Sequence, residues 1–419
     1  MSAAAVDVRI PGDKSLSHRA LILAALATGQ SRVTGLLDSA DVRSTAECLR
    51  RLGVAVPPIL SEVVVAGRGA NGLRDPTLDL DCGNSGTSAR LLAGLVAGSG
   101  RTGRLVGDGS LSRRPMQRIA EPLEAMGARV TFERGDGLPM VVEGAQLHSV
   151  EWTTRTASAQ IKSAILLAAL TSRVAVTVRE PVRSRDHTER MLSALGVPVA
   201  VDGTSVTLGA CEGPLAAFEF AVPGDPSSAA FFAAWALLAG RAVRTSVIST
   251  NPTRTGFFGA LERVGARIAY DDAGLRCGEP VGRVTIDGAL DAPFTIAASE
   301  VPALIDELPL IACLAAYAPG ETRITGAAEL RVKESDRIAA VVSNLRAIGA
   351  DAEELPDGLV VRGRRTALRG SIRTYGDHRI SMAFGVLGAI RGNNVVLDDR
   401  ECVAVSFPGF WAELARVSE

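Results

Sequence analysis

The chain has 419 residues and a formal net charge of −1, and 47% of its residues are hydrophobic, 22% charged and 4% aromatic. One hydrophobic core rarely extends over this length, so two domains are expected, and the balanced charge excludes a globally basic nucleic-acid surface. The longest apolar run, about 11 residues at 229–239, is shorter than the roughly 18 that a membrane span needs, and the first five residues lack a secretory signal. A cytoplasmic protein without membrane or nucleic-acid partners is predicted.

The cysteines are expected to be free thiols in a reducing compartment, because none form a C-x-x-C pair and most lie in apolar surroundings. They are Cys48, Cys82, Cys211, Cys277, Cys313 and Cys402. The four histidines show no metal-binding spacing, so the sequence predicts no metal site.

The first informative segment is residues 9–19, with the sequence RIPGDKSLSHR. An alternating strand precedes its Pro-Gly turn, and an apolar helix is predicted to follow. Lys14, Ser15 and Arg19 thereby gather at the start of a helix, where backbone N–H groups attract anions. Taken alone, the segment fits an anion site and an ordinary solvated helix cap equally well.

One pattern recurs along the whole chain. A β-rich segment leads through a charged loop into an amphipathic helix that ends in a hydrophobic-glycine pair, and a second β segment follows. The glycines fit left-handed positions after helices and are Gly53, Gly127, Gly196, Gly265 and Gly349. Each repeat also has a helix that is apolar on all sides, predicted at 19–27, 88–97, 159–170, 227–238, 306–316 and 378–390.

A sixth, degenerate repeat ends the chain with a helix predicted at 408–416. Repeats of roughly 70 residues predict two lobes of three, with the apolar helices buried beneath sheets. The crossover between the lobes is expected near Gly224-Asp225-Pro226.

Two apparent nucleotide motifs are rejected. A G-x-G-x-x-G pattern at 67–72 follows a strand, but residues 73–76 break the chain where a dinucleotide site needs a helix, so a hairpin turn is predicted. The segment Gly12-Asp13-Lys14-Ser15 lacks the glycine that precedes lysine in a P-loop, which argues against an NTPase.

Polar groups gather at the starts of other helices as well. Small residues at 81–90, among them Asn84 and Gly86, let backbone N–H groups approach a ligand closely. Pro115, predicted as the first residue of a helix, fixes the backbone after Arg114 and favours Arg114 over Arg113 as a ligand.

Residues 157–162 place a hydroxyl and an amide at a buried helix, and Arg185 lies near another cap. Asp306 and Glu307 precede a very apolar helix, where carboxylates can also simply complement the helix dipole.

The most charged segment is 331–337, RVKESDR. Lys333 and Arg337 are predicted to share a helical face, and a solvated charge run accounts for the segment equally well. Together, seven cations stand at equivalent helix starts, with Asp306 and Glu334 among them: Lys14, Arg19, Arg114, Arg185, Lys333, Arg337 and Arg379. If the lobes turn these starts toward one another, an interdomain cleft for phosphate and carboxylate ligands results.

In order along the chain, these motifs resemble the family of 5-enolpyruvylshikimate-3-phosphate synthases, which are enolpyruvyl transferases. The matching segments are 11–19, 83–87, 114–115, 158–160, 306–307, 333–337 and 377–379. The resemblance implies an α/β fold, an inside-out α/β barrel of two domains with three βαβαββ repeats each. Residues 1–12 with 225–419 would form one lobe, and residues 13–224 the other.

The reaction implied by the resemblance transfers the enolpyruvyl group of phosphoenolpyruvate to the 5-hydroxyl of shikimate 3-phosphate and releases phosphate. It belongs to the shikimate pathway, which leads through chorismate to the aromatic amino acids. The resemblance implies a monomer and no cofactor.

By position, the resemblance assigns shikimate 3-phosphate to Lys14, Ser15, Arg19, Ser158, Ala159, Gln160, Arg185, Asp306 and Lys333. It assigns phosphoenolpyruvate to Lys14, Gly86, Arg114, Gln160, Arg337 and Arg379, supported by Asn84 and His378. Asp306 would take the proton of the 5-hydroxyl, and Glu334 would protonate the methylene carbon of phosphoenolpyruvate. Lys14 is also expected to act in catalysis, because it would touch both substrates.

One feature of many family members is absent, because Val405 stands where they have a lysine before the C-terminal Phe-Pro. Residues 158–160 and 185–188, together with Val405, resemble the second class of these synthases. Glyphosate-tolerant members of that class have alanine at the position of Gly86, so this chain is expected to be inhibited by glyphosate.

Three alternatives are weighed against this interpretation. The sister family acting on UDP-N-acetylglucosamine usually has a loop cysteine before its Arg-Pro, and residues 107–114 contain none. A non-catalytic anion-binding repeat protein would not need Asp306 and Glu334 among the cations. An RNA-processing enzyme of related fold would need a basic surface, which the net charge of −1 does not indicate.

Overall fold

The computed structural model describes residues 5–211 and 213–419 and separates into two compact units. Unit 1 contains the N-terminal segment to Pro11, Pro223–Gly274 and Pro280–Glu419, and unit 2 contains Gly12–Val222 and Leu275–Glu279. The sequence predicts the lobe boundaries after residues 12 and 224, and no signal in it predicts the excursion of Leu275–Glu279 into unit 2. The first four residues, where no secretory signal is expected, lie outside the described part.

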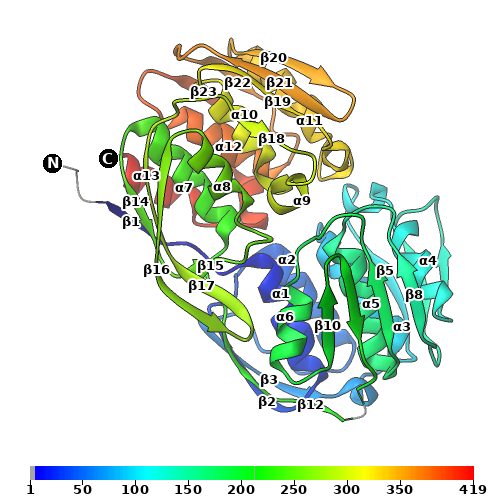
Figure 1. Cartoon of the computed structure of the whole chain (residues 1–419). Helices are drawn as coiled ribbons and strands as arrows, with labels where there is room; N and C mark the ends of the chain where they lie inside the picture. The colour runs from blue at the N-terminus through cyan, green and yellow to red at the C-terminus, as the bar shows by residue number, and fades with distance from the viewer. Residues whose placement is uncertain (1–4, 212) are drawn as a thin grey trace. The chain divides into compact units, whose positions relative to one another are not determined.

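Unit 2 is built from three four-stranded sheets and a set of α-helices (Figure 1). The helices are α1 (Lys14–Leu26), α2 (Ala40–Arg51), α3 (Gly86–Gly98), α4 (Gln117–Ala125), α5 (Ala159–Ser172) and α6 (His187–Ala194). The strands are β2 (Ala27–Thr34), β3 (Glu62–Arg68), β4 (Leu80–Asp81), β5 (Thr102–Val106), β6 (Arg129–Phe132), β7 (Met140–Glu143), β8 (Val150–Thr153), β9 (Val176–Arg179), β10 (Val199–Asp202), β11 (Ser205–Leu208), β12 (Leu215–Ala216) and β13 (Glu219–Ala221).

Unit 1 combines a five-stranded, a four-stranded and a two-stranded sheet. Its helices are α7 (Pro226–Ala239), α8 (Gly256–Arg263), α9 (Val301–Leu304), α10 (Leu308–Ala315), α11 (Arg337–Ala347), α12 (His378–Gly388) and α13 (Phe410–Ser418). Its strands are β1 (Val6–Val8), β14 (Val243–Thr245), β15 (Ile248–Ser249), β16 (Ala266–Arg276), β17 (Glu279–Gly288), β18 (Thr295–Ile296), β19 (Gly320–Ile324), β20 (Asp351–Leu355), β21 (Gly358–Gly363), β22 (Arg369–Ile372) and β23 (Asn394–Leu397).

The same strand order appears in several sheets. In unit 2, β4-β5-β7-β6 and β8-β9-β11-β10 each join a parallel pair to two antiparallel partners. Unit 1 has β18-β19-β21-β20 in the same arrangement, while its last repeat is reduced to the parallel pair β22-β23. A helix joins the two parallel strands in each of these repeats. The predicted βαβαββ repeats and the degenerate final repeat are therefore confirmed.

Two repeats take their first strand from the other half of the chain. Strand β1, which precedes α1 in sequence, pairs in parallel with β14 of unit 1, with Val6 opposite Val243. Strand β13, which precedes α7, pairs in parallel with β2 of unit 2, with Glu219 opposite Arg32. Each of these strands completes a sheet of one unit, while the helix that follows it belongs to the other unit. The chain therefore changes unit after Pro11 and after Val222.

In each unit the sheets lie around the apolar helices (Figure 1). Helices α1, α3 and α5 of unit 2, and α7, α10 and α12 of unit 1, are buried along most of their length, as their all-round apolar sequences predict. The amphipathic helices α2, α4, α6, α8 and α11 are followed by the five predicted glycines, whose φ angles lie between +81° and +111°. Glycine is favoured there because it has no Cβ to clash.

Helices α3 and α5 approach each other closely at two glycines of α3. A Cβ at Gly94 would lie 2.1 Å from the carbonyl oxygen of Ala164, and a Cβ at Gly98 would lie 2.2 Å from that of Ala168. Because only glycine permits this approach, these two positions fix how the helices pack. The packing also holds the N-terminal ends of α3 and α5, which carry predicted site residues, next to each other.

The turn predicted as a hairpin at 67–72 is a different structure. Strand β3 pairs with the preceding β2, and Ala70–Gly72 then form a single 3-10 turn that leads toward another sheet. The prediction of a hairpin is wrong because the strand that follows does not return to β3.

Two predicted helix starts are also wrong. Helix α11 begins only at Arg337, with Asp336 as its N-cap, so Lys333 precedes the helix and does not share a helical face with Arg337. Pro115 lies before α4, whose N-cap is Met116, so it is not the first helical residue. Helix α11 begins later than the spacing of its charges suggests, and α4 begins later than Pro115 suggests.

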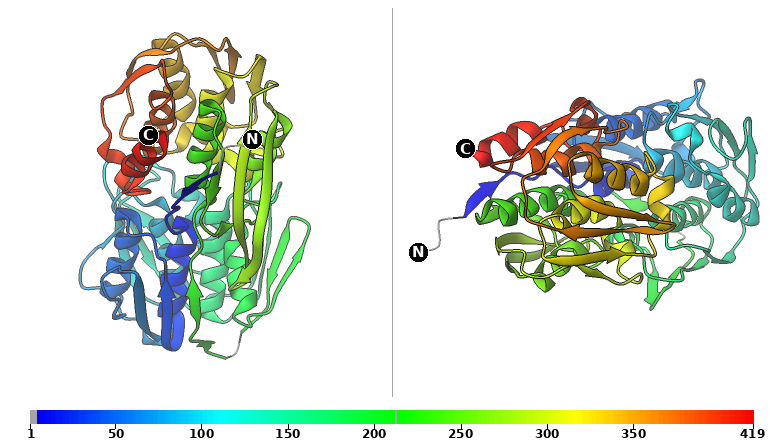
Figure 2. Two further views of the ribbon diagram at one scale, coloured as in Figure 1. Left: turned by 90° about the vertical axis from the view of Figure 1, so that its left-hand side faces the viewer. Right: turned by 90° about the horizontal axis from the view of Figure 1, so that it is seen from above.

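The two ends of the described chain lie side by side in unit 1 (Figure 2). The backbone N–H of Arg9 donates to Glu413 Oε1 at 2.8 Å, and Arg416 Nη2 donates to the carbonyl oxygen of Asp7 at 2.6 Å. Helix α13 thereby holds the N-terminal strand in its sheet.

All six cysteines are free thiols, as expected, and Cys48, Cys82 and Cys313 are buried. Across the described residues, no helix combines the length and the apolar character that crossing a membrane requires.

Candidate active site

In unit 2, the first group of predicted residues lies at the N-terminus of α1. Asp13 caps the helix by accepting the backbone N–H of Leu16 at 2.8 Å. Lys14 is the first helical residue, and its Nζ lies 2.9 Å from Oδ2 of the buried Asp41 on α2. Ser15 follows and is half-buried. The ammonium group of Lys14 is therefore held at the helix start by a neighbouring helix.

Arg19 occupies the junction of α1, α5 and α6. Its side chain is buried, and Nε donates to Thr188 Oγ1 at 2.7 Å while Nη2 donates to Ser163 Oγ at 2.8 Å. Nη1 donates to the carbonyl oxygen of Ser15 at 3.0 Å. These contacts fix a permanent positive charge beside the start of α1.

His18, which lies between these cations, has a structural role. Its Nδ1 is 2.7 Å from Thr45 Oγ1, which is in turn 2.7 Å from Ser88 Oγ, so the three side chains link α1, α2 and α3. Burial, followed by the charges of Lys14 and Arg19, holds the pKa of His18 well below its ordinary value. The imidazole is therefore neutral at physiological pH.

The second group surrounds the N-terminus of α3. Gly86 is the first residue of the helix, and the preceding Asn84 accepts a hydrogen bond from Arg114 Nη2 at 3.1 Å. Asn84 Nδ2 donates to Asp108 Oδ2 at 2.6 Å. Arg114 is buried whereas Arg113 is exposed, so the choice of Arg114 is consistent with this geometry.

The third group lies at the N-terminus of α5. Ser158 caps the helix, Ala159 is its first residue, and Gln160 contacts α3. Gln160 Oε1 accepts from Arg90 Nη1 at 2.6 Å, and Gln160 Nε2 donates to Thr87 Oγ1 at 3.0 Å. The side-chain amide of Gln160 is therefore oriented by two residues of the neighbouring helix.

Arg185 lies half-buried in the loop that leads into α6. The next residue, Asp186, accepts from Arg183 Nη2 at 2.7 Å and from Arg190 Nε at 2.9 Å, which braces this loop. Through Arg19, α1 is joined to α5 and α6, and through Gln160, α5 is joined to α3. Unit 2 thus brings its predicted residues onto connected helix starts.

In unit 1 the predicted residues gather around one guanidinium group. Arg337, at the start of α11, is 1% exposed; its Nε donates to Asp377 Oδ2 at 2.8 Å, its Nη2 to Glu334 Oε2 at 2.6 Å and its Nη1 to Asp306 Oδ1 at 3.3 Å. Burial alone would lower the pKa of Arg337, but Asp377 and Glu334 raise it, so the group stays charged. Burial would likewise raise the pKa of Asp377, and Arg337 lowers it.

Asp306 is surrounded by cations. It lies in a 3-10 turn just before α10, and besides Arg337 its carboxylate is 3.9 Å from Lys333 Nζ and 3.7 Å from Arg379 Nη2. Arg379 Nη1 also lies 3.3 Å from Oε1 of the buried Glu307. His378 starts α12 beside Arg379 and is buried. Three cations, Lys333, Arg337 and Arg379, thus lie between 3.3 and 3.9 Å from the carboxylate of Asp306.

The two carboxylates predicted to move protons, Asp306 and Glu334, therefore share one buried cation. A shared guanidinium keeps both side chains oriented, and proton transfer by oriented carboxylates is general acid-base chemistry. Among the described residues, no group of three or more His, Cys, Asp or Glu side chains is arranged to hold a metal ion.

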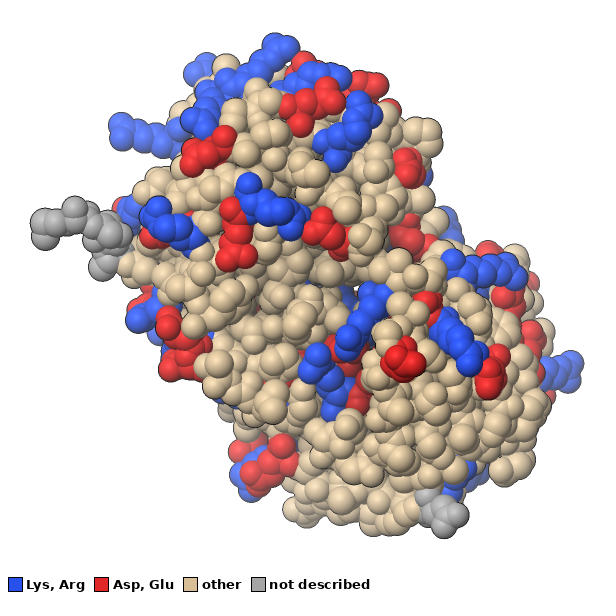
Figure 3. All heavy atoms as spheres, in the orientation of Figure 1, with Lys and Arg blue, Asp and Glu red and all other residues tan. Residues whose placement is uncertain are grey.

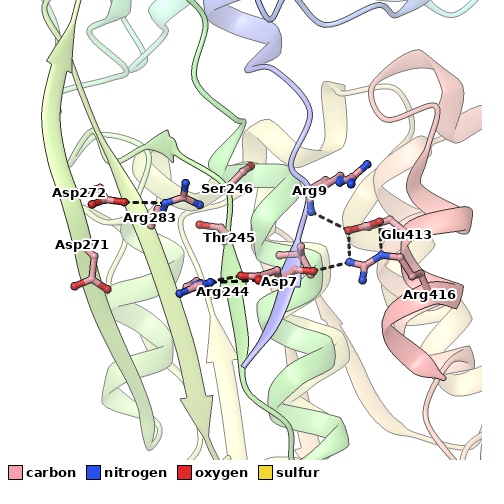
Figure 4. Close-up of a pocket in the computed structure, with 11 residues that line it drawn as sticks. Asp7, Arg9, Arg244, Thr245, Ser246, Asp271, Asp272, Arg283, Glu413 and Arg416 are labelled. Carbon is pink, nitrogen blue, oxygen red and sulfur yellow. Dashed lines mark hydrogen bonds and ion pairs between the residues drawn. The ribbon is translucent and has the colours of Figure 1, made fainter. Parts of the chain in front are cut away.

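A large hollow in unit 1 has a different character. It has a volume of about 810 Å³ and lies against β1, β14, β17 and α13, where none of the predicted site residues lines it (Figure 4). Ion pairs line it: Arg244 pairs with Asp7, Arg283 with Asp272 and Arg416 with Glu413, and of these side chains all but that of Glu413 are largely exposed. On the face drawn in Figure 3, positive and negative side chains are likewise interspersed rather than gathered by sign.

Comparison with known proteins decides the family. The family model described as EPSP synthase (3-phosphoshikimate 1-carboxyvinyltransferase) matches residues 2–414. The chain belongs to the EPSP synthase family. Among family members named 3-phosphoshikimate 1-carboxyvinyltransferase, that of Sulfurihydrogenibium sp. (strain YO3AOP1) is 43% identical, covering 99% of this chain and 97% of that protein. That of Bacillus subtilis (strain 168) is 42% identical, with 99% and 97% covered.

A solved EPSP synthase from Acinetobacter baumannii has the same fold. It superposes with a TM-score of 0.85 at 39% sequence identity, covering 99% of this chain and 96% of that one. The predicted α/β fold of enolpyruvyl transferases is thereby confirmed.

Several side chains that hold the predicted site residues are not themselves among the residues predicted for the site. Asp41 contacts Lys14, Arg90 orients Gln160, and Asp377 binds Arg337 through both carboxylate oxygens. Asp377 and Arg90 lie inside segments that the sequence singles out, which is a usable signal. Asp41 resembles any acidic residue in a first helical turn, so nothing in the sequence marks it.

Proposed function

We propose that this chain transfers the enolpyruvyl group of phosphoenolpyruvate to the 5-hydroxyl of shikimate 3-phosphate, the transferase reaction of its family in aromatic amino acid biosynthesis. Family membership supports the reaction. The assignment of roles rests on one structural observation. Asp306 and Glu334 both contact the buried guanidinium group of Arg337. A binding protein for anions would have no use for two carboxylates at such a position.

Shikimate 3-phosphate is assigned to helix starts of unit 2. Lys14, Ser15, Arg19 and Asp306 would bind this substrate. The site of its phosphate would be completed by Ser158, Ala159, Gln160, Arg185 and Lys333. Helix N-termini without an acidic cap suit a phosphate, because backbone N–H groups and the helix dipole both favour negative charge. Helix α5, capped by Ser158, provides such a terminus.

Phosphoenolpyruvate is assigned to Lys14, Gly86, Arg114, Gln160, Arg337 and Arg379, with Asn84 and His378 in support. The hydrogen bond from Arg114 to Asn84, beside Gly86, supports the first part of this set. The guanidinium groups suit a carboxylate and a phosphate, which they bind through paired N–H donors.

The proposed chemistry is an addition followed by an elimination. Asp306 accepts the proton of the 5-hydroxyl as its oxygen attacks the central carbon of phosphoenolpyruvate, and Glu334 delivers a proton to the methylene carbon. In the second step Glu334, now ionised, takes a proton from the methyl group so formed, the double bond returns, and phosphate departs with the proton that Asp306 had accepted. Lys14, a cation expected to reach both substrates, would stabilise the negative charge that develops on them.

The assignment is tested by following phosphate release. The purified protein is mixed with phosphoenolpyruvate and shikimate 3-phosphate, and separately with phosphoenolpyruvate and UDP-N-acetylglucosamine. Release with the first pair alone is expected. Release with the second pair alone would place the chain with the sister transferases, and release with neither would leave an anion-binding protein.

We also propose that glyphosate inhibits the enzyme by competing with phosphoenolpyruvate at Gly86. A Cβ at this position would lie 2.7 Å from Arg90 Nη1 and 3.2 Å from Arg114 Nη1, so Gly86→Ala narrows the space beside both guanidinium groups. Millimolar glyphosate should lower turnover of the wild type at low phosphoenolpyruvate, and Gly86→Ala should be less sensitive. Full turnover of the wild type under these conditions would contradict the proposal.

We further propose a cytoplasmic monomer that needs no cofactor. All groups assigned to the reaction come from one chain, the six free thiols suit a reducing compartment, and acid-base chemistry requires no metal. Light scattering on the purified protein should give a mass near the 43.6 kDa of one chain, and a chelator should leave turnover unchanged.

A further inference from the structure

A buried cluster of charges lies behind the predicted phosphate site of unit 2. Lys162, the fourth residue of α5, is 1% exposed, and its Nζ lies 2.7 Å from Glu180 Oε2 and 2.8 Å from Glu189 Oε1. Both carboxylates are buried as well. Neither Glu180 nor Glu189 belongs to the residues assigned to substrate, so the reaction itself does not account for the cluster.

Glu180 is the member that joins the two loops assigned to the phosphate. Its Oε1 accepts the backbone N–H of Ser158 at 2.9 Å, just before α5. Its Oε2 accepts Ser184 Oγ at 2.9 Å and the backbone N–H of Ser184 at 3.3 Å, next to Arg185. One carboxylate therefore sets the positions of two segments that lie 26 residues apart in the chain.

The backbone bond also prepares Ser158 for a ligand. Ser158 Oγ accepts from the N–H of Ile161 at 3.4 Å in its capping role, and its own hydroxyl proton can then be donated to a phosphate oxygen. Because the N–H of Ser158 is occupied by Glu180, the residue cannot rotate away from α5 without breaking a charge-assisted hydrogen bond.

Lys162 makes this arrangement possible. Burying two carboxylates destabilises the folded state unless a cation compensates their charge, and Lys162 contacts both of them. Burial opposes the charge of Lys162, but Glu189 and Glu180 raise its pKa, so it remains protonated. The cation also ties α5 to α6, on which Glu189 lies.

We propose that Glu180 is a positioning residue that fixes Ser158 and Arg185 for the 3-phosphate of the acceptor substrate, with Lys162 as its counter-ion. This assignment rests on the proposed function. It concerns a single substrate, because phosphoenolpyruvate is assigned to residues that Glu180 does not contact, and the one shared residue of α5, Gln160, is oriented separately by Arg90 and Thr87.

The test is a kinetic comparison of Glu180→Gln with the wild type, varying each substrate in turn. The neutral amide keeps the size of the side chain. Its NH₂ group faces Lys162 or a hydrogen-bond donor of Ser184, where the carboxylate accepted a hydrogen bond, and this mismatch displaces the loops that contain Ser158 and Ser184. We expect KM for shikimate 3-phosphate to rise roughly tenfold to a hundredfold, the effect of a lost hydrogen bond to a charged group. KM for phosphoenolpyruvate and kcat should change by less than about threefold, which is within the effect of one weak neutral hydrogen bond.

Two further variants keep the test decisive if Glu180→Gln folds poorly. Ser184→Ala removes only the hydroxyl donor and should raise the same KM in the same sense, by a smaller factor. Val65→Ala, in the buried part of β3 away from the site, serves as the control for a general loss of stability and should leave both KM values unchanged. Hydrogen exchange of the amides of Ser158 and Ser184, measured without substrate, should accelerate in Glu180→Gln and not in Val65→Ala.

Equal changes in both KM values would show that Glu180 is merely structural and overturn the assignment. Unchanged kinetics in a folded Glu180→Gln would do the same. A wild type that releases no phosphate with the two substrates would instead refute the proposed function, and this role of Glu180 with it.

Discussion

The two units share a repeat topology, yet they treat the starts of their buried helices differently. In unit 2, α3 and α5 are capped by the neutral Ser85 and Ser158. Of the three buried helices described in this unit, α1 alone has an acidic cap. In unit 1, α7 and α12 are capped by Asp225 and Asp377, and Asp306 and Glu307 lie just before α10. A carboxylate at a helix N-terminus already satisfies its N–H groups and its dipole, whereas a serine leaves room for an anion from outside.

In the proposed reaction, this difference gives the two units different tasks. The neutral caps of unit 2 suit substrate phosphate and carboxylate groups. The acidic helix starts of unit 1 supply side chains that can carry protons, and they remain ordered because Arg337 and Arg379 compensate them. In the proposed reaction, unit 2 would contribute most of the anion-binding helix starts, and unit 1 would be the acid-base half, which also supplies Arg337 and Arg379 to phosphoenolpyruvate.

The largest expected effect comes from removing a proton carrier in unit 1. Asp306→Ala should lower kcat by about 10²- to 10⁴-fold, the usual contribution of a general base, while unit 2 still binds shikimate 3-phosphate. Stopped-flow or steady-state phosphate release measures the first quantity and calorimetry the second. Glu353→Ala, an exposed carboxylate on β20 of the same unit, is the matched control and should keep full activity.

Next in size is the loss of the central cation. Arg337→Met leaves Asp306, Glu334 and Asp377 without their shared partner, and breaking a buried ion pair costs about 3–5 kcal/mol in free energy of unfolding. Urea unfolding followed by tryptophan fluorescence should report this loss, because Trp235 is buried in unit 1.

The control for this variant has the same number of partners at the surface. Arg362 contacts Glu321, Asp351 and Glu353, yet 41% of its side chain is exposed, so solvent compensates their charges when it is removed. Arg362→Met should leave the unfolding midpoint nearly unchanged. A loss comparable to that of Arg337→Met would show that burial does not decide the difference.

The pH dependence of stability should differ between the units. In unit 1, Arg337 lowers the pKa of Asp377 despite burial, so Asp377 stabilises the fold above its ordinary value of 3.8 and loses this contribution as the pH falls through its lowered pKa. In unit 2, burial raises the pKa of Glu189 despite Lys162, so its ionised form weakens the fold at neutral pH, and acidification toward 4.5 removes that cost.

Denaturant titrations between pH 7 and pH 3 can separate these two contributions. The difference in free energy of unfolding between wild type and Glu189→Gln should shrink as the pH approaches 4.5. The difference between wild type and Asp377→Asn should shrink only below 3.8. The reverse order would contradict the assignment of opposite pKa shifts to the two units.

The smallest effect is expected in the outer hollow of unit 1. Arg244→Ala removes one exposed partner of Asp7, and neither kcat nor either KM should change, because the charges there are solvated and engaged with one another. A selective loss of substrate affinity in this variant would show that the acid-base half extends to the outer face of the sheet.

The sequence predicts much of the fold because its strongest signals are local. The six apolar helices are hydrophobic on all sides, and the five glycines after the amphipathic helices adopt the positive φ angles that their pattern indicates. The polar clusters at helix starts were found for the same reason. Short strands such as β4 and β12 offer no alternation to detect, since two residues do not define a period.

What the sequence does not show depends on contacts between distant segments. The excursion of Leu275–Glu279 places Glu279 3.1 Å from Nδ1 of His187, and no local pattern announces this pairing. Glu180 looks like any acid at the end of a strand until its bonds to Ser158 and Ser184 are seen. Lys333 and Arg337 illustrate the opposite error. Their spacing of four residues suggests one helix, but Lys333 lies before the helix that starts at Arg337.

The exchange of first strands has a consequence for how the protein is made. Residues of β1 and β14 that bond across the sheet, such as Asp7 and Arg244, are 237 positions apart. At synthesis rates of roughly 5–20 residues per second, β1 leaves the ribosome on the order of 10–50 s before its partner exists. The whole contiguous part of unit 2 is synthesised in that interval. The first strand to be made is therefore among the last to find its place.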